Sequence, residues 1–323
     1  MDFGIIGLGN HSMNRVIPAI RKAGFSIGSI YSSDEVKGRQ VAESNGSTYY
    51  HDLKSMLASG VEAVYIGSPN FLHYPQAKMA LEAGKHVLLE KQMTLSVQDA
   101  SDLVSLSRSR GLKLAVGFHM RFHPAVEKAR NLVASGAVGK PEIISGMWGG
   151  PPSSPHTNEK QKWWTEDDKV GGGSIMGTGV HVIDSLIYVL GKKPEKVMSV
   201  KFPPGKVIDS TQQVGLVYPD MVATAISSRG TPSPDNSLYI FGTEGTLACR
   251  DVFGVGIKGS LVRDGRVMET YDGGSPYEGE VRSFAALVNG ESSNIARGED
   301  GENVVRITAA ANQSALSGLV VPL

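Results

Sequence analysis

A glycine-rich stretch near the start of this 323-residue chain is the first candidate for chemistry. Gly7 and Gly9 follow the apolar run 3–6, and apolar residues then recur at helical spacing, so the pattern predicts a strand, a tight turn and a helix. Gly9 has no Cβ to keep a phosphate from the backbone, and the first N–H groups of a helix attract negative charge. The stretch therefore predicts a pyrophosphate site, unless its glycines serve only to turn the chain. The expected contacts are Gly7, Gly9, Asn10, His11 and Ser12.

A second candidate is the pair Glu90 and Lys91, which ends an apolar run that begins at His86. In a parallel sheet with helices on both faces, ligands bind beyond the carboxyl ends of the strands. A charged pair at such a strand end is therefore expected to face the ligand. The alternative is a structural ion pair that closes the strand.

The third candidate is His181, which lies in an apolar stretch that predicts a helix over 174–190, after three consecutive glycines. His181, Asp184 and Ser185 share one helical face because they are spaced i, i+3 and i+4. An imidazole pKa near 6.5 suits proton exchange at neutral pH, and Asp184 is placed to orient the ring or a substrate hydroxyl. The alternative is a buried histidine with a structural role.

Short apolar strands alternate with helical stretches over residues 1–118. Such alternation is typical of a parallel sheet with helices on both faces, so we expect an N-terminal Rossmann dinucleotide-binding domain, followed by a second domain over residues 119–323. The expected strands are 3–6, 26–31, 48–50, 63–66, 86–90 and 112–116. The expected helices are 13–23, 35–45, 53–58, 75–83 and 97–110.

The residues after the second expected strand bear on the choice of cofactor. Folds that prefer NAD usually carry Asp or Glu at the position of Ser32, where the carboxylate accepts hydrogen bonds from the ribose. Ser32 and Ser33 can instead donate to a 2′-phosphate, and Lys37 and Arg39 can add positive charge. We therefore predict that NADP is preferred and that NAD is possible. Alternatively, the serines cap the next helix and both cations are solvated.

The fourth expected strand ends before the sequence Gly67-Ser68-Pro69-Asn70. Proline and asparagine are turn residues, so we expect a loop here that lies over the cofactor. The expected contacts are Ser68, Asn70 and His73.

Composition excludes several function classes. The formal net charge is zero and the pI is about 7.1, which argues against a nucleic acid or an anionic membrane as partner. Cys249 is the only cysteine, so no internal disulfide is possible, and no cluster of metal ligands is evident. No run of about 18 apolar residues occurs, and Phe3 already belongs to the first expected strand. We therefore expect a cytoplasmic protein.

Taken together, the motifs resemble the Gfo/Idh/MocA family of oxidoreductases, which includes glucose–fructose oxidoreductase and inositol 2-dehydrogenase. The resemblance runs through nearly the whole chain in the same order. It rests on Gly7-Leu8-Gly9, Ser68-Pro69-Asn70 with His73, residues 83–91, residues 171–173, Gly179-Val180-His181 with Asp184, and residues 241–246.

The resemblance implies an α/β protein with a Rossmann domain and a C-terminal α/β domain whose open sheet is mainly antiparallel. It implies reversible hydride transfer between a nicotinamide and a sugar, a polyol or a related hydroxyl compound. In such a reaction Lys91 binds substrate and cofactor, and His181 is the acid/base. Two residues depart from the family pattern: Gln92 replaces a proline that often follows a cis bond, and Gly177 replaces an aspartate. A cis bond before a residue other than proline costs about 3 kcal/mol, so we expect Lys91 to be presented differently.

The second half adds two further candidates for substrate binding. Arg121 matches an arginine of the family at the crossing between the domains, where its alternative is a purely structural role. Residues 149–169 are polar and contain Trp163 and Trp164. Long irregular segments often form binding loops, so Trp163 is a candidate to stack on a sugar, or else it anchors the loop or contacts another subunit.

Strands and turns alternate between residues 196 and 271, with a period-two pattern of apolar residues. One face of this sheet needs a cover, and a neighbouring subunit in a homodimer or homotetramer is the expected one. Two other functions stay open. One is a protein that binds NADP and a sugar without turnover. The other is an oxidoreductase for a non-sugar substrate such as an aromatic diol.

Overall fold

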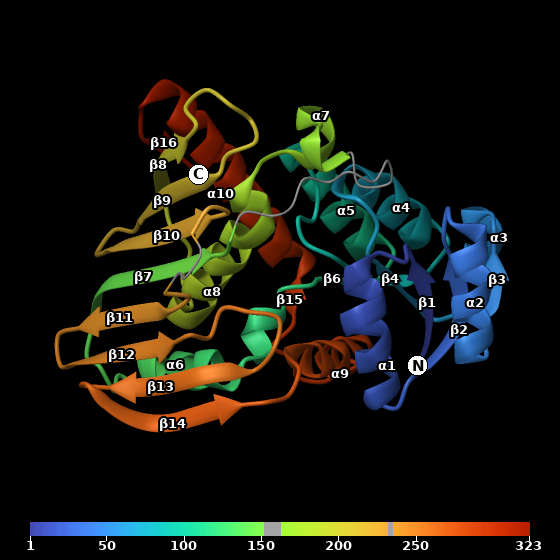
Figure 1. The fold of residues 1–323 in the computed structure, drawn as a ribbon, viewed down its shortest axis with the longest axis horizontal. Coiled ribbons are helices and arrows are strands. Elements are labelled where there is room, and N and C mark those ends of the chain that lie inside the picture. Colours follow the sequence, from blue (N-terminus) through green and yellow to red (C-terminus); the bar gives the residue numbers. More distant parts are fainter. Residues whose placement is uncertain (152–162, 232–234) are drawn as a thin grey trace. The chain divides into compact units, whose positions relative to one another are not determined.

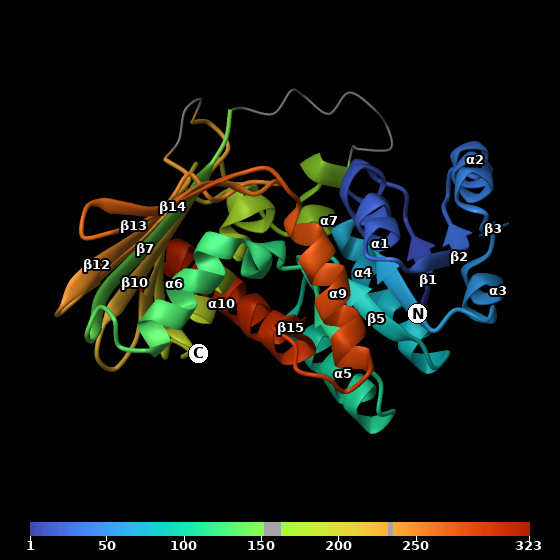
Figure 2. The same ribbon diagram turned by 90° about the horizontal axis from the view of Figure 1, so that it is seen from below.

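The computed structural model describes residues 1–151, 163–231 and 235–323, which form two compact units (Figures 1 and 2). Unit 1 combines Met1–His119 with Tyr277–Val305, and unit 2 combines Met120–Pro276 with Arg306–Leu323.

Residues Tyr277–Val305 lie in unit 1, whereas the sequence analysis placed all of 119–323 in the second domain. Two contacts explain the difference. The short strand β15 (Ala296–Arg297) pairs with β6 (Leu114–Val116), and the ring of Phe284 lies 6.0 Å from that of Phe3. Both contacts join segments far apart in the chain, so no local pattern predicts them.

A seven-stranded sheet forms the centre of unit 1, in the order β15-β6-β5-β4-β1-β2-β3. All neighbouring strands pair in parallel except β15, which runs antiparallel to β6. The strands preceding β6 are β1 (Asp2–Ile6), β2 (Ser26–Tyr31), β3 (Thr48–Tyr50), β4 (Ala63–Ile66) and β5 (His86–Leu89).

The helices of unit 1 connect these strands and cover both faces of the sheet. The chain steps away from β1 in one direction through β3 and in the other from β4 to β6, and right-handed crossovers then place the two sets of helices on opposite faces. They are η1, a π-helical turn (Ser12–Val16), α1 (Ile17–Lys22), α2 (Glu35–Asn45), α3 (Leu53–Leu57), α4 (Asn70–Glu82), α5 (Val97–Ser109) and α9 (Pro276–Val288).

The elements expected for residues 1–118 are observed with small shifts, and one expectation is wrong. The loop expected after Pro69 is the first turn of α4, which starts at Asn70 and includes Pro75. Pro69 is tolerated just before the helix because no N–H is needed at that position. The sequence analysis took Pro75 as the start of the helix instead of Asn70, so it placed this boundary five residues too late.

A nine-stranded sheet forms the centre of unit 2, in the order β14-β13-β12-β11-β7-β10-β9-β8-β16. It is open and antiparallel throughout except for the parallel pair β7 and β10, which confirms the expected sheet. The strands are β7 (Pro141–Gly149), β8 (Lys196–Phe202), β9 (Thr211–Val217), β10 (Val222–Ser228), β11 (Leu238–Gly242), β12 (Gly245–Arg250), β13 (Lys258–Arg263), β14 (Arg266–Asp272) and β16 (Val321–Pro322).

Helices pack on one face of this sheet: α8 contacts β7 and β10, and α6 contacts β12 and β13. The helices of unit 2 are η2 (His119–Phe122), α6 (Pro124–Ala134), α7 (Asp167–Val170), η4, a π-helical turn (Ile175–Gly179), and α8 (Val180–Leu190), while α10 (Gly298–Ser317) crosses the boundary between the units. The stretch Asp167–Leu190 is apolar and long enough to span a bilayer, but 83% of its most apolar window is buried inside the protein, as in a core helix.

The other sheet face carries exposed apolar side chains, which we call the open face. Val222 of β10 and Phe241 of β11 flank Ile143 of β7 in register, and each is at least 43% exposed. Met198, Val200 and Phe202 alternate along β8 with buried residues. The open face therefore consists of Ile143, Met198, Val200, Phe202, Val222 and Phe241.

Candidate functional site

The glycine turn lies between β1 and η1, at the carboxyl edge of the unit 1 sheet. Gly7 has φ +89°, and a Cβ there would lie 2.9 Å from the backbone N of Ser68, so only glycine fits. Its N–H donates to the carbonyl of Tyr31 at 3.0 Å. Gly9 and Asn10 are exposed, which leaves their backbone open to a phosphate. Ser12 is completely buried, and a Cβ on Gly67 would lie 2.5 Å from its Oγ, so Ser12 serves close packing.

The residues after β2 bring one cation to this turn. Lys37 Nζ donates to the carbonyl of Leu8 at 2.5 Å, while Arg39 pairs with Glu35 on the exposed surface of α2 at 2.7 Å. The serines do not cap α2 directly, because the capping side chain is that of Asp34, which accepts from the Lys37 N–H. Ser32 Oγ accepts the Asp34 N–H at 3.2 Å. Ser32, Ser33 and Lys37 therefore remain the candidates for binding a 2′-phosphate. Arg39 is instead a solvated surface charge, the alternative given in the sequence analysis.

A buried carboxylate connects the turn to the end of β5. Oε1 of Glu90 accepts the hydroxyl of Tyr65 at 3.1 Å and lies 3.1 Å from Nε2 of His11. Burial raises the pKa of Glu90, but the positive charges of His11, Lys91 and His119 outweigh burial and hold the pKa well below its usual range. Glu90 is thus an ionised anchor for its neighbours and only 7% exposed. The tyrosine had no signal in the sequence beyond its place in an apolar strand.

The expected contacts after β4 have mainly internal partners. The ring of His73 is buried, and its two nitrogens lie 2.9 Å from the carbonyl of Ser68 and 2.7 Å from that of Gln92. His73 therefore holds the start of α4 against the segment that carries Lys91. Ser68 Oγ donates to Gln76, and Asn70 is buried at the first position of α4. The Lys91–Gln92 peptide is cis, so the expectation that the absence of proline would change this bond is wrong.

A second carboxyl group, that of Glu280 on α9, is completely buried in the same unit. Neither of its oxygens has a hydrogen-bond partner within the described ranges. Burial, and next the negative charge of Glu90, raise the pKa of Glu280 well above its usual value. Glu280 therefore keeps its proton to a higher pH than an ordinary carboxyl group does, and sequence reasoning did not single it out.

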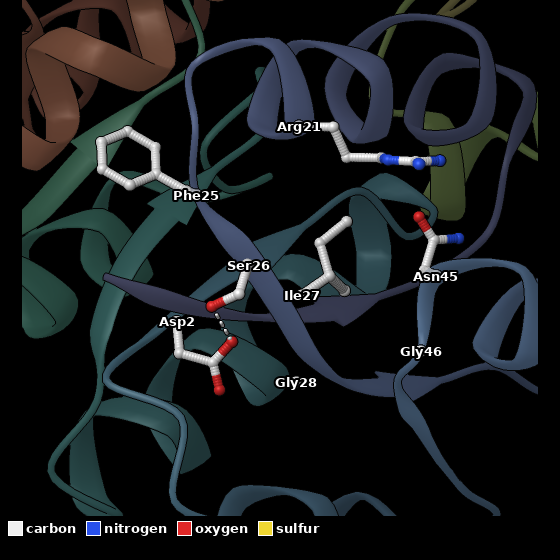
Figure 3. A pocket seen from close by; sticks show the side chains of 8 residues that line it. All are labelled: Asp2, Arg21, Phe25, Ser26, Ile27, Gly28, Asn45 and Gly46. Atoms are coloured by element: carbon white, nitrogen blue, oxygen red, sulfur yellow. Dashed lines mark hydrogen bonds between the residues drawn. The ribbon is translucent and has the colours of Figure 1, made fainter.

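Figure 3 shows a hollow in unit 1 at the opposite edge of the sheet. Asp2 and Ser26, joined by a 2.7 Å hydrogen bond, begin β1 and β2 there, and Gly46 follows the end of α2. None of the expected site residues lines this hollow. It lies at the amino ends of the strands, where a Rossmann fold does not bind its dinucleotide.

In unit 2, Arg121 and Asp184 form a buried ion pair. Nε and Nη2 of the guanidinium donate to the two carboxylate oxygens at 2.9 and 2.6 Å, and the side chains are 7% and 1% exposed. The sequence analysis placed both residues at the substrate. Their pairing supports the structural alternative for Arg121, because it ties the segment entering unit 2 to α8.

His181 lies on the first turn of α8 and is 3% exposed. Its ring centroid lies 5.2 Å from that of Trp148 on β7, at 36°. The hydroxyl of Ser185, which was expected on the same face, donates to the backbone carbonyl of His181 at 2.8 Å. This hydroxyl therefore bonds within the helix. The buried side chain of Asp209 fixes the segment that precedes this helix, because it accepts hydrogen bonds from the N–H groups of Gly173 and Ser174.

Trp163 stacks on Trp164, with ring centroids 4.2 Å apart. Trp164 in turn lies 5.4 Å from Cζ of Arg229, a residue that follows β10 and that the sequence analysis missed. The residues of the surrounding loop from 152 to 162 lie outside the described part of the chain. Trp163 therefore has an aromatic partner of its own, which supports an anchoring role.

Comparisons with known proteins extend over both units. A family described as an oxidoreductase family with an NAD-binding Rossmann fold matches residues 1–118, and one described as the GFO/IDH/MocA C-terminal domain matches residues 126–248. The chain is 30% identical to D-xylose 1-dehydrogenase (NADP(+)) 2 of Haloferax volcanii, over 100% of both chains. It is 28% identical to 1,5-anhydro-D-fructose reductase of Ensifer adhaerens, over 93% of this chain and 91% of that protein.

The fold also matches the crystal structure of aldose–aldose oxidoreductase from Caulobacter crescentus, complexed with glycerol. The TM-score is 0.89 at 22% identity, over 100% of this chain and 99% of the other. This likeness confirms the expected fold class, a Rossmann domain followed by an α/β domain.

The buried acid of Glu280 generates a pH-dependent stability prediction. The folded state keeps the proton of Glu280 above the ordinary carboxyl pKa near 4.3, whereas the unfolded chain releases it. Over that range the free energy of unfolding falls as pH rises, by about 1.4 kcal/mol per pH unit for one site. We expect Glu280→Gln to remove this slope, so that the variant gains stability over the wild type as the pH rises above the ordinary carboxyl pKa. Urea titrations at several pH values measure it.

The matched control is Glu43→Gln, which changes an exposed carboxyl group on α2. A stability difference between Glu280→Gln and the wild type that stays constant with pH would show that Glu280 is ionised in the folded state.

Proposed function

This chain belongs to the Gfo/Idh/MocA family of oxidoreductases, as its motifs predicted, and we propose that it transfers hydride between NADP(H) and a carbon of a sugar or polyol. The observation that carries this proposal is the glycine turn of unit 1, where Gly9 and Asn10 are exposed at the carboxyl edge of the parallel sheet. Glu90 and Lys91 follow β5 at the same edge. Rossmann folds bind dinucleotides at this edge.

The residues present fit a phosphorylated dinucleotide. The exposed backbone at Gly9 lies at the start of η1, and the nearest atom to a Cβ placed there would be the carbonyl oxygen of Gly67 at 3.7 Å. Lys37 adds a cation beside the turn, and Ser32 and Ser33 add hydroxyl donors without a repelling carboxylate. When bound, the nicotinamide supplies the hydride acceptor or donor. The names of the xylose dehydrogenase and anhydrofructose reductase relatives support both NADP and a sugar-like substrate.

Two side chains carry the proposed chemistry. Lys91 donates a hydrogen bond to the alcohol oxygen and stabilises the negative charge that develops there. His181 takes the hydroxyl proton in the oxidation and returns it in the reduction. Glu90 acts through its neighbours, because its ionised carboxylate attracts Lys91 and His11. The cytoplasmic location expected from the sequence stays a prediction.

His181→Asn tests the acid/base role. We expect kcat to fall by about 10²- to 10⁴-fold. The asparagine amide can still form a hydrogen bond near the position of the imidazole nitrogen, but it accepts no proton at neutral pH. NADPH binding, followed by fluorescence titration, should stay unchanged. The assay follows nicotinamide absorbance with a panel of aldoses, polyols and an aromatic diol.

The control is His51→Asn, an exposed histidine of unit 1. Wild-type kcat in His181→Asn would remove this residue from proton transfer. Turnover of the diol alone would favour the non-sugar alternative, and cofactor binding without any turnover would favour the non-catalytic one.

Lys37→Ala tests the cofactor preference. A charge-assisted hydrogen bond contributes about 1.5–3 kcal/mol, so the KM for NADP should rise about 10- to 100-fold, with little change in the KM for NAD. Arg39→Ala is the control, because Arg39 already pairs with Glu35. Equal losses for both nucleotides in Lys37→Ala, or a wild-type preference for NAD, would refute the NADP assignment.

We further propose that the open face is covered by a second copy of the chain in a homodimer or homotetramer. The six apolar side chains lie on one face of the same sheet, three on the neighbouring strands β11, β7 and β10 and three on β8. Large exposed apolar sets of this kind usually mark interfaces. The open face is part of unit 2 alone.

Val200→Asp places a charge on the open face at a residue that is 65% exposed. Light scattering coupled to gel filtration should show a smaller assembly than the wild type, because burial of an unpaired carboxylate disfavours association. Val36→Asp, at an exposed valine of α2 in unit 1, is the control. A monomeric wild type at micromolar concentration would contradict the proposal.

A further inference from the structure

Arg229 brings a half-buried guanidinium to the helix that carries His181. Its backbone N–H donates to the carbonyl of Ser210 at 2.7 Å, and its Cζ lies 5.4 Å from the ring centroid of Trp164. Within the described ranges, no hydrogen bond or ion pair of the Arg229 guanidinium is found. The guanidinium, a planar and permanently charged group with five N–H donors, is thus held in place by stacking, and none of these donors has an acceptor among the described residues.

Gly177 is the reason that the guanidinium can lie here. A Cβ on Gly177 would be 3.0 Å from Nη2 and 3.4 Å from Nε of Arg229, so the arginine fills the space of a side chain at this position. Gly177 precedes His181 by four residues along η4 and α8, about one helical turn, which places both on one side of the helix.

Further contacts connect the segment around Gly177 to the ring of His181. Thr178 Oγ1 donates to the carbonyl of Trp148 at 3.1 Å, and the ring of Trp148 lies beside that of His181. The cation, the glycine and the imidazole thus belong to one continuous part of unit 2.

Asp209 acts on Arg229 through its charge, but its carboxylate oxygens accept hydrogen bonds from other residues. Asp209 is 1% exposed and already accepts the N–H groups of Gly173 and Ser174 and the hydroxyl of Ser174. Burial lowers the pKa of Arg229, and Asp209 only partly offsets this effect. A guanidinium remains protonated at any physiological pH, so Arg229 keeps its charge and its planar set of N–H donors for a bound anion.

We propose that Arg229 binds a carboxylate of the substrate, so that the chain acts on a sugar acid, such as a uronate, in preference to a neutral sugar. This inference rests on the proposed hydride transfer and specifies its substrate class. One planar guanidinium matches the single charge and the two oxygens of a carboxylate. A phosphate monoester carries up to two charges and therefore suits a site with more than one cation.

The test compares kcat/KM for D-glucuronate and D-galacturonate with the values for D-glucose, D-galactose and D-glucose 6-phosphate, with NADP in the full-length enzyme. The wild type should prefer the uronates. Arg229→Gln should lower kcat/KM for them by about 10- to 100-fold, mainly through KM, while neutral sugars change less than about threefold. Arg229→Lys should fall between, because it keeps the charge but loses the fork.

The matched control is Arg266→Gln, at an exposed arginine on β14. Equal losses for acid and neutral sugars in Arg229→Gln, a wild-type preference for neutral sugars, or a preference for the phosphorylated sugar would each overturn the carboxylate assignment while leaving hydride transfer intact. No turnover of any sugar, with NADP binding retained, would instead overturn the proposed function on which this inference rests.

Discussion

The contact between the imidazole of His11 and the buried carboxylate of Glu90 is the interaction on which the candidate site residues of unit 1 depend. His11 belongs to the glycine turn and Glu90 to the end of β5, so one contact ties the expected phosphate site to the residue before Lys91. Tyr65 on β4 holds the same carboxylate oxygen from the strand between them. An ionised group is stable at this depth only because these partners surround it. Burial, and next the negative charge of Glu90, raise the pKa of the second buried carboxyl group, that of Glu280.

In unit 2, two other buried carboxylates hold the segments around His181. Asp184 binds Arg121 through both oxygens, and Asp209 binds the backbone where the helix of His181 begins. Both aspartates have their acceptor oxygens engaged by the protein. Unit 2 therefore fixes the position of His181 with anions and presents a cation, Arg229, beside Gly177. Such an arrangement favours a negatively charged substrate over a neutral polyol.

Local patterns predicted much of the fold because they depend on near neighbours in the chain. The strand, turn and helix at Gly7 follow from glycine conformation and apolar spacing, and the alternation of elements over residues 1–118 follows from periodicity. The start of α4 was misplaced because Pro75 resembles a helix start, although the first turn begins at Asn70. The assignment of Tyr277–Val305 to unit 1 had no local signal, because it depends on pairing between β15 and β6.

By itself, the sequence determined the Rossmann topology, the family, and the residue types available to a dinucleotide at Gly9, Ser32 and Lys37. Each of these follows from spacing along the chain or from motifs read in order. Only the tertiary structure decided which charges meet. It paired Arg121 with Asp184 across 63 residues, buried Glu280 near Glu90, and placed Arg229 where Gly177 has no side chain. Those outcomes depend on desolvation and on close approach between distant segments, which no short-range pattern contains.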